Sequence, residues 1–451
     1  MLSACASYYQ NNQVIMDSIY LGNYANASKQ LDNGNLKKKK RNELLYLMNK
    51  GTVLFMNNQP DESNKYFQQA DYYIEDYQKN LGLKAVSFIT NPSIQTYEGE
   101  NFEKVMIHYY TTINYLQQGL LDNALVECKR MQLKLDKITD YYKGKNKYKN
   151  DAFVHLLTGI VYDAQKDYNS AFIAYRNAYK IYNEEYTTNL NTSVPSQLKE
   201  DLIRTALLTG FKEEARQYKT LFKLQHVTIE SFKNTSPFVT FWNNGFCPIK
   251  DQWSINFTIV PGSNGWVNFT NWDLGLNFPF YAGEDSRSII NLKIIRVAFP
   301  KYISRETVYN EAKIIIDSLQ IHQSYELVQN IDKIAYVSLQ DRMIKEMGEA
   351  LLRLAIKQAA AAKLRKENDA LGSALSVINA MSEQADTRNW QTLPNTINYT
   401  RLNLPVGNYQ AVFQVEKDIL KFNFILKGNE TTFKVFQSPY FKGYSSSFQN
   451  K

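Results

Sequence analysis

Residues 152–182 read AFVHLLTGIVYDAQKDYNSAFIAYRNAYKIY, and this spacing predicts two helices joined by a short turn. Gly159 and Tyr162 lie one turn apart in the first expected helix. In the second, small and aromatic residues recur at helical spacing on one face, at Ala171, Tyr175 and Ala178. A glycine at position 159 lets the two helices approach closely, because a larger side chain would push them apart. The pattern is typical of a tetratricopeptide repeat, a helix–turn–helix unit of about 34 residues.

Further copies of this unit occur along the first half of the chain. Residues 44–70 and 108–131 carry small residues at the matching places, namely Gly51, Ser63, Ala70, Gly119 and Ala124. Weaker copies surround residues 22–27 and 210–215, and an insert at 80–101 separates the two stronger ones. Because stacked repeats of this kind build a solenoid, we expect a tetratricopeptide-like helical domain over residues 8–225.

A solenoid of this type presents a concave groove to peptides or partner proteins. The polar residues that we expect nearest to this groove are Asn49, Thr111, Thr158 and Arg204. The same positions would also suit merely solvated side chains. The fold alone does not identify a ligand.

The second half of the chain changes character near residue 225. Short segments of alternating polarity predict strands at residues 238–242, 253–260, 266–269, 274–280 and 289–299, and again within 385–415 and 420–436. Between them, Arg305–Leu319 and the alanine-rich Ile334–Lys366 are expected to be helical. The expected fold class is therefore α+β with several domains. An N-terminal tetratricopeptide-like α-solenoid precedes a β-rich domain over residues 226–451, which carries inserted helices at about 305–385.

Composition restricts the class of protein. The 451 residues carry a formal net charge of +8, to which the run Lys37–Arg41 contributes, and this mild excess predicts no nucleic-acid partner. No stretch approaches the ~18 uninterrupted apolar residues of a membrane-spanning helix. The 32 Tyr and 24 Phe are abundant alongside Asn and Lys, as an AT-rich genome produces, so they do not by themselves indicate a binding surface.

The first residues, Met1-Leu2-Ser3-Ala4-Cys5, have the form of a bacterial lipobox. In such a sequence the thiol of the cysteine, here Cys5, accepts a diacylglycerol, and the acyl chains anchor the protein to a membrane. A signal sequence should precede a lipobox, so we expect that the true start lies upstream or that the sequence has been trimmed. No acidic residue follows Cys5, which favours the periplasmic face of a bacterial outer membrane. An incidental cysteine in a frayed terminus is the alternative.

No pattern in the sequence predicts catalysis, a metal or a cofactor. The three cysteines and four histidines are scattered, and no GxSxG, HExxH or phosphate-binding loop is present. Cys247 lies beside Pro248, and no histidine is closer to it in sequence than His226. We therefore expect Cys247 to be a partly buried free thiol and not a catalytic residue. The run Asp386–Trp390 is expected to pin local structure through an Asp–Arg pair and a buried ring, with partner binding as the alternative.

Tryptophans interleaved with asparagine mark the segment that follows residue 240. Trp253, Trp266 and Trp272, together with Trp242, could stack on sugar rings, because a flat apolar ring matches the C–H face of a pyranose. They could equally fill the core of a small β domain. We therefore hold glycan contact as an alternative for Trp253, Trp266 and Trp272.

Several segments together resemble a family of uncharacterised bacterial envelope lipoproteins with tetratricopeptide-like repeats. They are the lipobox, the helical array, YEGENFEKVMIHYY at 97–110, GFCPIK at 245–250 and ADTRNWQTLPNTINYTRLNLPVGNY at 385–409. The resemblance covers nearly the whole chain, with ADTRNWQTLP as its most distinctive part. It departs from the family around Trp253–Trp272. The resemblance implies envelope placement and a non-enzymatic role, and it carries over no catalytic residues.

Two functions are expected, and a third is the least favoured. The first is a lipid-anchored outer-membrane scaffold whose repeat groove binds an envelope protein or peptide. The second is a sugar-capture lipoprotein that uses the Trp- and Asn-rich insertion. The third is an envelope hydrolase. The first two are non-enzymatic and need no cofactor.

Overall fold

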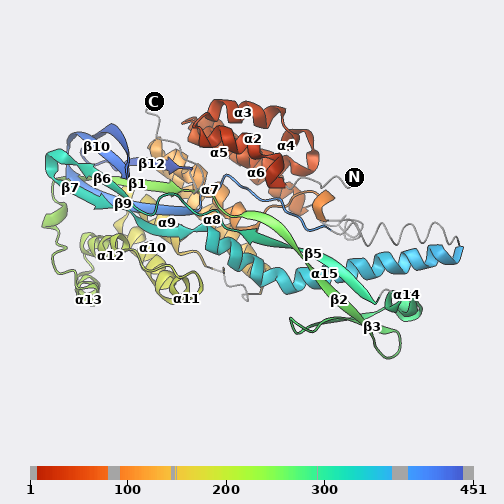
Figure 1. Ribbon diagram of the computed structural model, residues 1–451. Helices are drawn as coiled ribbons and strands as arrows, with labels where there is room; N and C mark the ends of the chain where they lie inside the picture. The colour runs from red at the N-terminus through yellow and green to blue at the C-terminus, as the bar shows by residue number, and fades with distance from the viewer. Residues whose placement is uncertain are drawn as a thin grey trace.

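The computed structural model describes residues 8–79, 92–143, 148, 150–291, 293–367 and 384–439, so the lipobox with Cys5 lies outside the described residues. Helices occupy the N-terminal half, and strands with one long helix occupy the C-terminal half (Figure 1). The expected mixture of helices and sheets in this order is confirmed.

The described N-terminal half consists mainly of consecutive helices, most of which pack on the next helix in the chain. The helices are α1 (Tyr8–Asn11), α2 (Gln13–Tyr20), α3 (Tyr24–Asn33), α4 (Asn35–Lys38), α5 (Glu43–Met56), α6 (Pro60–Lys79), α7 (Asn101–Gln117), α8 (Leu121–Tyr141), α9 (Ala152–Ala164), α10 (Tyr168–Ile181), α11 (Thr187–Asn189), α12 (Ser196–Thr209) and α13 (Lys212–Phe222). Side-chain caps start several of them. Asp151 accepts hydrogen bonds from the backbone N–H groups of Phe153 and Val154, and so satisfies two free donors at the start of α9.

Two glycines set how closely paired helices approach. Gly51 of α5 faces the ring of Phe67 on α6, and Gly159 of α9 faces the ring of Tyr175 on α10. A Cβ atom added at Gly51 would lie 2.8 Å from the Phe67 ring, so only glycine fits this crossing. The two contacts are equivalent in the two helix pairs, as the sequence pattern predicts.

The described residues of the C-terminal half form three four-stranded sheets. We call them the central sheet, with the strand order β12-β1-β9-β8, the outer sheet, with the order β11-β10-β6-β7, and the arm sheet, with the order β4-β3-β2-β5. Their strands all lie within residues 235–438. The strands are β1 (Thr235–Asn244), β2 (Ile249–Pro261), β3 (Trp266–Asn271), β4 (Leu276–Tyr281), β5 (Ile294–Ile303), β6 (Ala312–Ile316), β7 (Ile321–Ser324), β8 (Glu326–Asn330), β9 (Thr396–Pro405), β10 (Gly407–Val415), β11 (Asp418–Leu426) and β12 (Thr432–Ser438).

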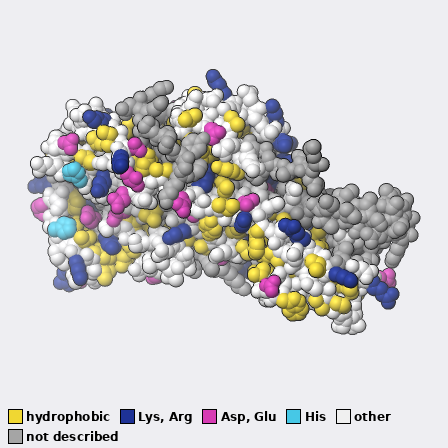
Figure 2. Space-filling view, in the orientation of Figure 1, with side chains coloured by type: hydrophobic (Ala, Val, Ile, Leu, Met, Phe, Trp, Pro, Cys, Tyr) yellow, Lys and Arg dark blue, Asp and Glu magenta, His cyan; other side chains and the backbone are white. Residues whose placement is uncertain are grey.

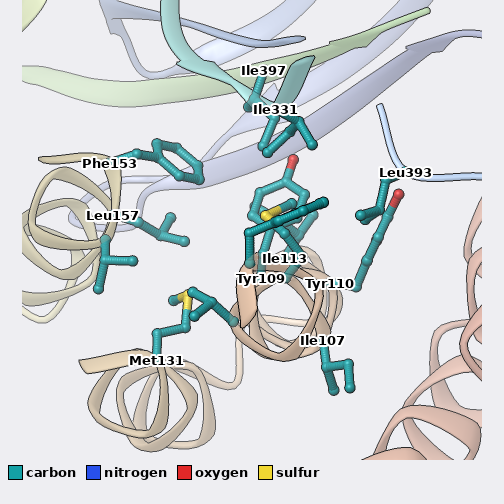
Figure 3. Close-up of a cluster of buried hydrophobic side chains, with 14 of the residues drawn as sticks. Ile107, Tyr109, Tyr110, Ile113, Met131, Phe153, Leu157, Ile331, Leu393 and Ile397 are labelled. Carbon is teal, nitrogen blue, oxygen red and sulfur yellow. The ribbon is translucent and has the colours of Figure 1, made fainter. Parts of the chain in front are cut away.

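The central sheet lies between the helices and the outer sheet, and its residues alternate between the two layers. Val239 and Phe241 of β1 belong to the core shared with the helices, while Phe238 and Trp242 belong to the core shared with the outer sheet. In Figure 3, side chains of α7 lie between those of α8 and α9 and those of the central sheet, with Tyr109 near Ile397. The helices and the central sheet therefore share one continuous core across the change of character near residue 225.

The arm is a separate lobe built from the arm sheet, α14 (Ser286–Ile290) and the outer part of α15 (Ile331–Glu367). It projects from the body beside the long α15 (Figure 1). Its own core holds Phe257, Phe269 and Val297 of the sheet against Met347 and Leu351 of α15. The opposite face of the sheet is left uncovered by this core.

One expected helix is wrong. Arg305–Leu319 contains β6, which pairs with β10, in place of a helix. Ala312, Ile314 and Ile316 are buried, whereas Lys313, between Ala312 and Ile314, is exposed, and this alternation matches a sheet with one covered face. The expected alanine-rich helix at Ile334–Lys366 is present as α15, Ile331–Glu367.

Candidate functional site

Two of the four expected groove residues face the chain's own C-terminal half. Asn49 is buried, its Nδ2 donates to the Leu45 carbonyl at 2.7 Å, and its Oδ1 accepts from the Thr392 hydroxyl at 3.0 Å. Arg204 is buried against Asp163 and Asp201, and its guanidinium lies over the ring of Phe232, 5.8 Å from the ring centroid. These positions are therefore closed to a separate partner.

The other two, Thr111 and Thr158, face a neighbouring helix. The Thr111 hydroxyl lies 3.0 Å from a Glu127 carboxylate oxygen on α8. The half-buried Thr158 bonds to the Val154 carbonyl at 2.7 Å and to the thiol of Cys128, also on α8. The prediction of an open groove is therefore wrong for Asn49, Thr111 and Arg204, which are buried, whereas Thr158 is half-buried.

Three distinctive sequence segments converge at the root of the arm. Glu100, at the start of α7, forms buried ion pairs with Lys250 of β2 and Arg342 of α15. Burial alone would raise the pKa of Glu100, but the two cations outweigh it and hold that pKa well below its usual range. These ion pairs join segments 97–110 and 245–250 to α15, and a hydrogen bond from the Trp390 backbone to Glu103 adds segment 385–394 to this network.

The neighbouring Glu103 stays inside this network. Its carboxylate accepts hydrogen bonds from the Tyr97 hydroxyl at 2.6 Å and from the Trp390 backbone N–H at 2.7 Å. Burial, and then the charge of Glu100, raises the pKa of Glu103. Two carboxyl groups with opposite pKa shifts are a pattern found in acid–base sites. Glu103, however, is fully buried and does not line the cavity beside Glu100, so a substrate has no access to it.

Cys247 lies in the same region, and its environment argues against a nucleophile. The thiol is buried, and burial raises its pKa to about 12, so it stays protonated at neutral pH. His226 is exposed on a different segment. Within the described residues, no group of His, Cys, Asp or Glu side chains could hold a metal ion.

Arg388 pins the segment that carries Trp390. Its guanidinium pairs with Asp386 at 2.6 Å and donates to the backbone carbonyls of Pro92 and Gln95. The ring beneath the guanidinium is that of Tyr97, 5.3 Å away, and Trp390 is the fully buried ring of the run. The Asp386–Arg388 pair therefore connects chain segments, as its structural interpretation requires.

The tryptophans separate into buried and exposed members. Trp242 is buried between the central and outer sheets, and Trp253 is half-buried on the covered face of the arm sheet, near Phe299. Trp266 is 44% exposed on β3, and Trp272 is 73% exposed in the turn between β3 and β4. Glycan contact by Trp253 is therefore not supported, because its ring packs towards the arm's core.

The uncovered face of the arm sheet brings Trp266 beside a residue that the sequence reading missed. Tyr281 of β4 is 68% exposed and lies directly opposite Trp266, with ring centroids 5.7 Å apart. The alternation of residues 276–281 could have predicted the exposure of Tyr281, because Phe278 and Phe280 face the core and Tyr281 does not. Hydrophobic side chains are visible on this lobe in Figure 2.

Polar side chains continue the same face along the strands. Asn268 lies two residues beyond Trp266, and Asn256, Thr258 and Asn277 are exposed on β2 and β4. With a rise of about 3.4 Å per residue, the path from Trp266 to Thr270 covers about 14 Å. The face combines two aromatic rings with a row of hydrogen-bonding groups, and we take it as the candidate binding site.

No described helix combines the length and apolarity needed to cross a lipid bilayer.

Comparisons with known proteins do not identify a family for this chain. No protein-family model matches this chain, and a search of curated proteins found no match either.

Proposed function

We propose that this protein is a non-enzymatic, glycan-binding lipoprotein of the bacterial envelope and that the uncovered face of the arm sheet is its binding surface. The observation that carries the proposal is the exposed pair Trp266 and Tyr281 at one end of a row of amide and hydroxyl side chains. The flat rings suit the C–H faces of sugars, while Asn256, Asn268 and Asn277 can both donate to and accept from sugar hydroxyls.

The remainder of the chain would support and anchor this surface. The stacked helix pairs, with Gly51 and Gly159 at their crossings, are consistent with tetratricopeptide-like repeats. In this proposal they form a rigid base, because the chain's own central sheet covers them. A lipid on Cys5 would hold the protein at the periplasmic side of the outer membrane.

Removing the two rings should abolish or strongly weaken glycan binding. We expect the Trp266→Ala/Tyr281→Ala variant to bind at least about tenfold more weakly, a loss of roughly 1.4 kcal/mol. The measurement is binding of the full chain to a glycan array of microbial, plant and host polysaccharides, followed by calorimetry with the strongest glycan. Tyr72→Ala is the matched control, because Tyr72 is similarly exposed but lies on α6. Equal binding by the double variant and the unchanged protein would contradict the proposal, as would no binding to any glycan.

Lipidation should depend on Cys5 alone. When the gene is expressed in a bacterial host fed a labelled fatty acid, we expect a labelled protein that fractionates with membranes. Cys5→Ala should lose the label, because no other thiol stands in a lipobox. Cys128→Ala, at a buried cysteine of α8, should keep it. Label that persists in Cys5→Ala would show that the lipobox is incidental.

A protein-interaction scaffold is the second candidate, and one observation favours it. The arm helix α15 exposes Ile344, Leu352 and Ile356, and exposed apolar side chains grouped on one element often mark protein contacts. An apolar segment of an envelope protein would be the occupant. The two candidates use different surfaces. Glycan binding that disappears with Trp266 and Tyr281 supports the first, and its absence from the unchanged protein favours the second.

A further inference from the structure

A cavity of about 670 Å³ lies away from the uncovered face of the arm sheet, among the N-terminal helices. Side chains of α5, α6, α7 and α8, the segment before α7, and Arg342 of α15 line it. Its size falls within the range of about 300–1,000 Å³ that is common for small-molecule sites. Unlike the junction around Glu103, this cavity is reached from outside.

Part of the cavity lining is aromatic and apolar. Tyr73 and Ile74 of α6 line the cavity together with Ile138 and Tyr142 at the end of α8. The ring of Tyr73 is stacked with that of Tyr77, with centroids 6.5 Å apart and planes 9° from parallel. These side chains offer flat surfaces to an apolar or aromatic body.

The remaining lining residues include several cations. Lys104, Lys134, Lys137 and Arg342 line it, whereas Glu98 is the one acidic residue among the lining residues that the structure describes. Lys134 is already paired with Asp71 at 2.6 Å, and Arg342 is paired with Glu100. These two cations are therefore compensated within the protein.

Lys104 and Lys137 differ from the other two. Across the described part of the chain, neither ammonium group has an ion pair or hydrogen bond. Lys104 is half-buried on α7, and burial lowers its pKa. Glu98, Glu100 and Glu103 attract this ammonium group without forming an ion pair and do not outweigh its burial, so an anion in direct contact with it would offset the remaining cost.

We propose that this cavity binds a small organic anion, with its acid group against Lys104 and Lys137 and its aromatic or apolar body against Tyr73, Ile138 and Tyr142. The inference does not depend on the glycan proposal, because the two sites share no residue. The recognised chemistry is an acid group joined to a flat or apolar body. Neither part alone would contact both the cationic and the apolar lining residues.

Two fluorescent probes of nearly the same shape test the charge requirement. 8-Anilinonaphthalene-1-sulfonate carries an anionic group, and N-phenyl-1-naphthylamine is its neutral counterpart. We expect the full chain to bind the sulfonate at one site per protein, with affinity that falls as salt is added. Lys104→Met should weaken sulfonate binding by about tenfold, because a hydrogen-bonded charge is removed, and should leave the neutral probe within about twofold.

Matched variants keep the result interpretable. Lys137→Met should weaken sulfonate binding in the same direction, whereas Lys212→Met, at an exposed lysine of α13, should leave it unchanged. Each variant's melting temperature establishes that it is folded. Unchanged sulfonate affinity in Lys104→Met and Lys137→Met would overturn the proposal. So would an equal loss for both probes, because that result would mean that the cavity wall had changed shape.

Discussion

Replacing Asp163 with alanine should lower the free energy of unfolding by about 3–5 kcal/mol, the usual result of breaking a buried ion pair. Asp163 of α9 lies between Arg204 of α12 and Arg401 of β9, with an Arg401 Nη1 to Asp163 Oδ2 distance of 2.5 Å. All three side chains are almost fully buried. Without Asp163, two buried guanidinium groups would share Asp201 alone.

Urea unfolding followed by circular dichroism measures the effect. Glu213→Ala is the control, because Glu213 pairs with Arg216 on the exposed surface of α13 and should contribute at most about 0.5 kcal/mol. An Asp163→Ala variant as stable as the unchanged protein would show that the charged cluster does not hold the helices to the central sheet. It would also show that the ion pair between Asp163 of α9 and Arg401 of β9 contributes little to stability.

The same cluster gives stability a pH dependence with a definite sign. Burial alone would raise the pKa of Asp163, but Arg204 and Arg401 outweigh burial and hold it well below its usual range. The folded pKa is thus lower than the unfolded value of about 3.9. Its contribution is fully present above that value and is lost as pH falls below it. Asp163→Ala should therefore flatten the acid side of the stability profile.

The helical half was predictable because its signals are local. Gly51 and Gly159 recur at equivalent places in two helix pairs, and a helix crossing leaves that mark within about 30 residues of sequence. The helix expected at Arg305–Leu319 failed for the opposite reason. The segment Ala312–Ile316 becomes a strand because β10, which begins almost a hundred residues further along at Gly407, pairs with it. Such a distant partner leaves no mark in the local pattern.

The groove prediction failed because burial of polar residues cannot be read from their type. Asn49 and Arg204 are polar, and in a sequence this suits a solvated concave face. In the folded chain, Thr392 satisfies Asn49, while Asp163 satisfies Arg204. By contrast, the alternation of side chains along β2 could have predicted which way Trp253 faces. Trp253 has the same parity as Ile255 and Phe257 on β2, so it had to face the core of the arm.

Gly159→Leu should destabilise the protein by about 3 kcal/mol, at the upper end of the usual cost of overpacking. A Cβ atom at this position would lie only 2.5 Å from Cδ1 and Cε1 of Tyr175. Tyr175 cannot easily move aside, because it is fully buried and its hydroxyl lies 3.2 Å from Asp163. Even the single methyl group of Gly159→Ala should be destabilising. The measurement is the shift in urea midpoint and melting temperature.

Gly348 of α15 supplies the control of opposite sign. A Cβ atom added there would meet the Phe278 ring at 3.7 Å, an ordinary contact distance. Gly348→Ala should therefore gain up to about 1 kcal/mol, because alanine favours a helix interior over glycine. Both substitutions replace a helical glycine with alanine, so helix propensity predicts the same gain for each. Only the packing of α9 on α10 can make their effects opposite in sign. A stabilised Gly159→Ala protein would mean that α9 and α10 do not cross at Gly159.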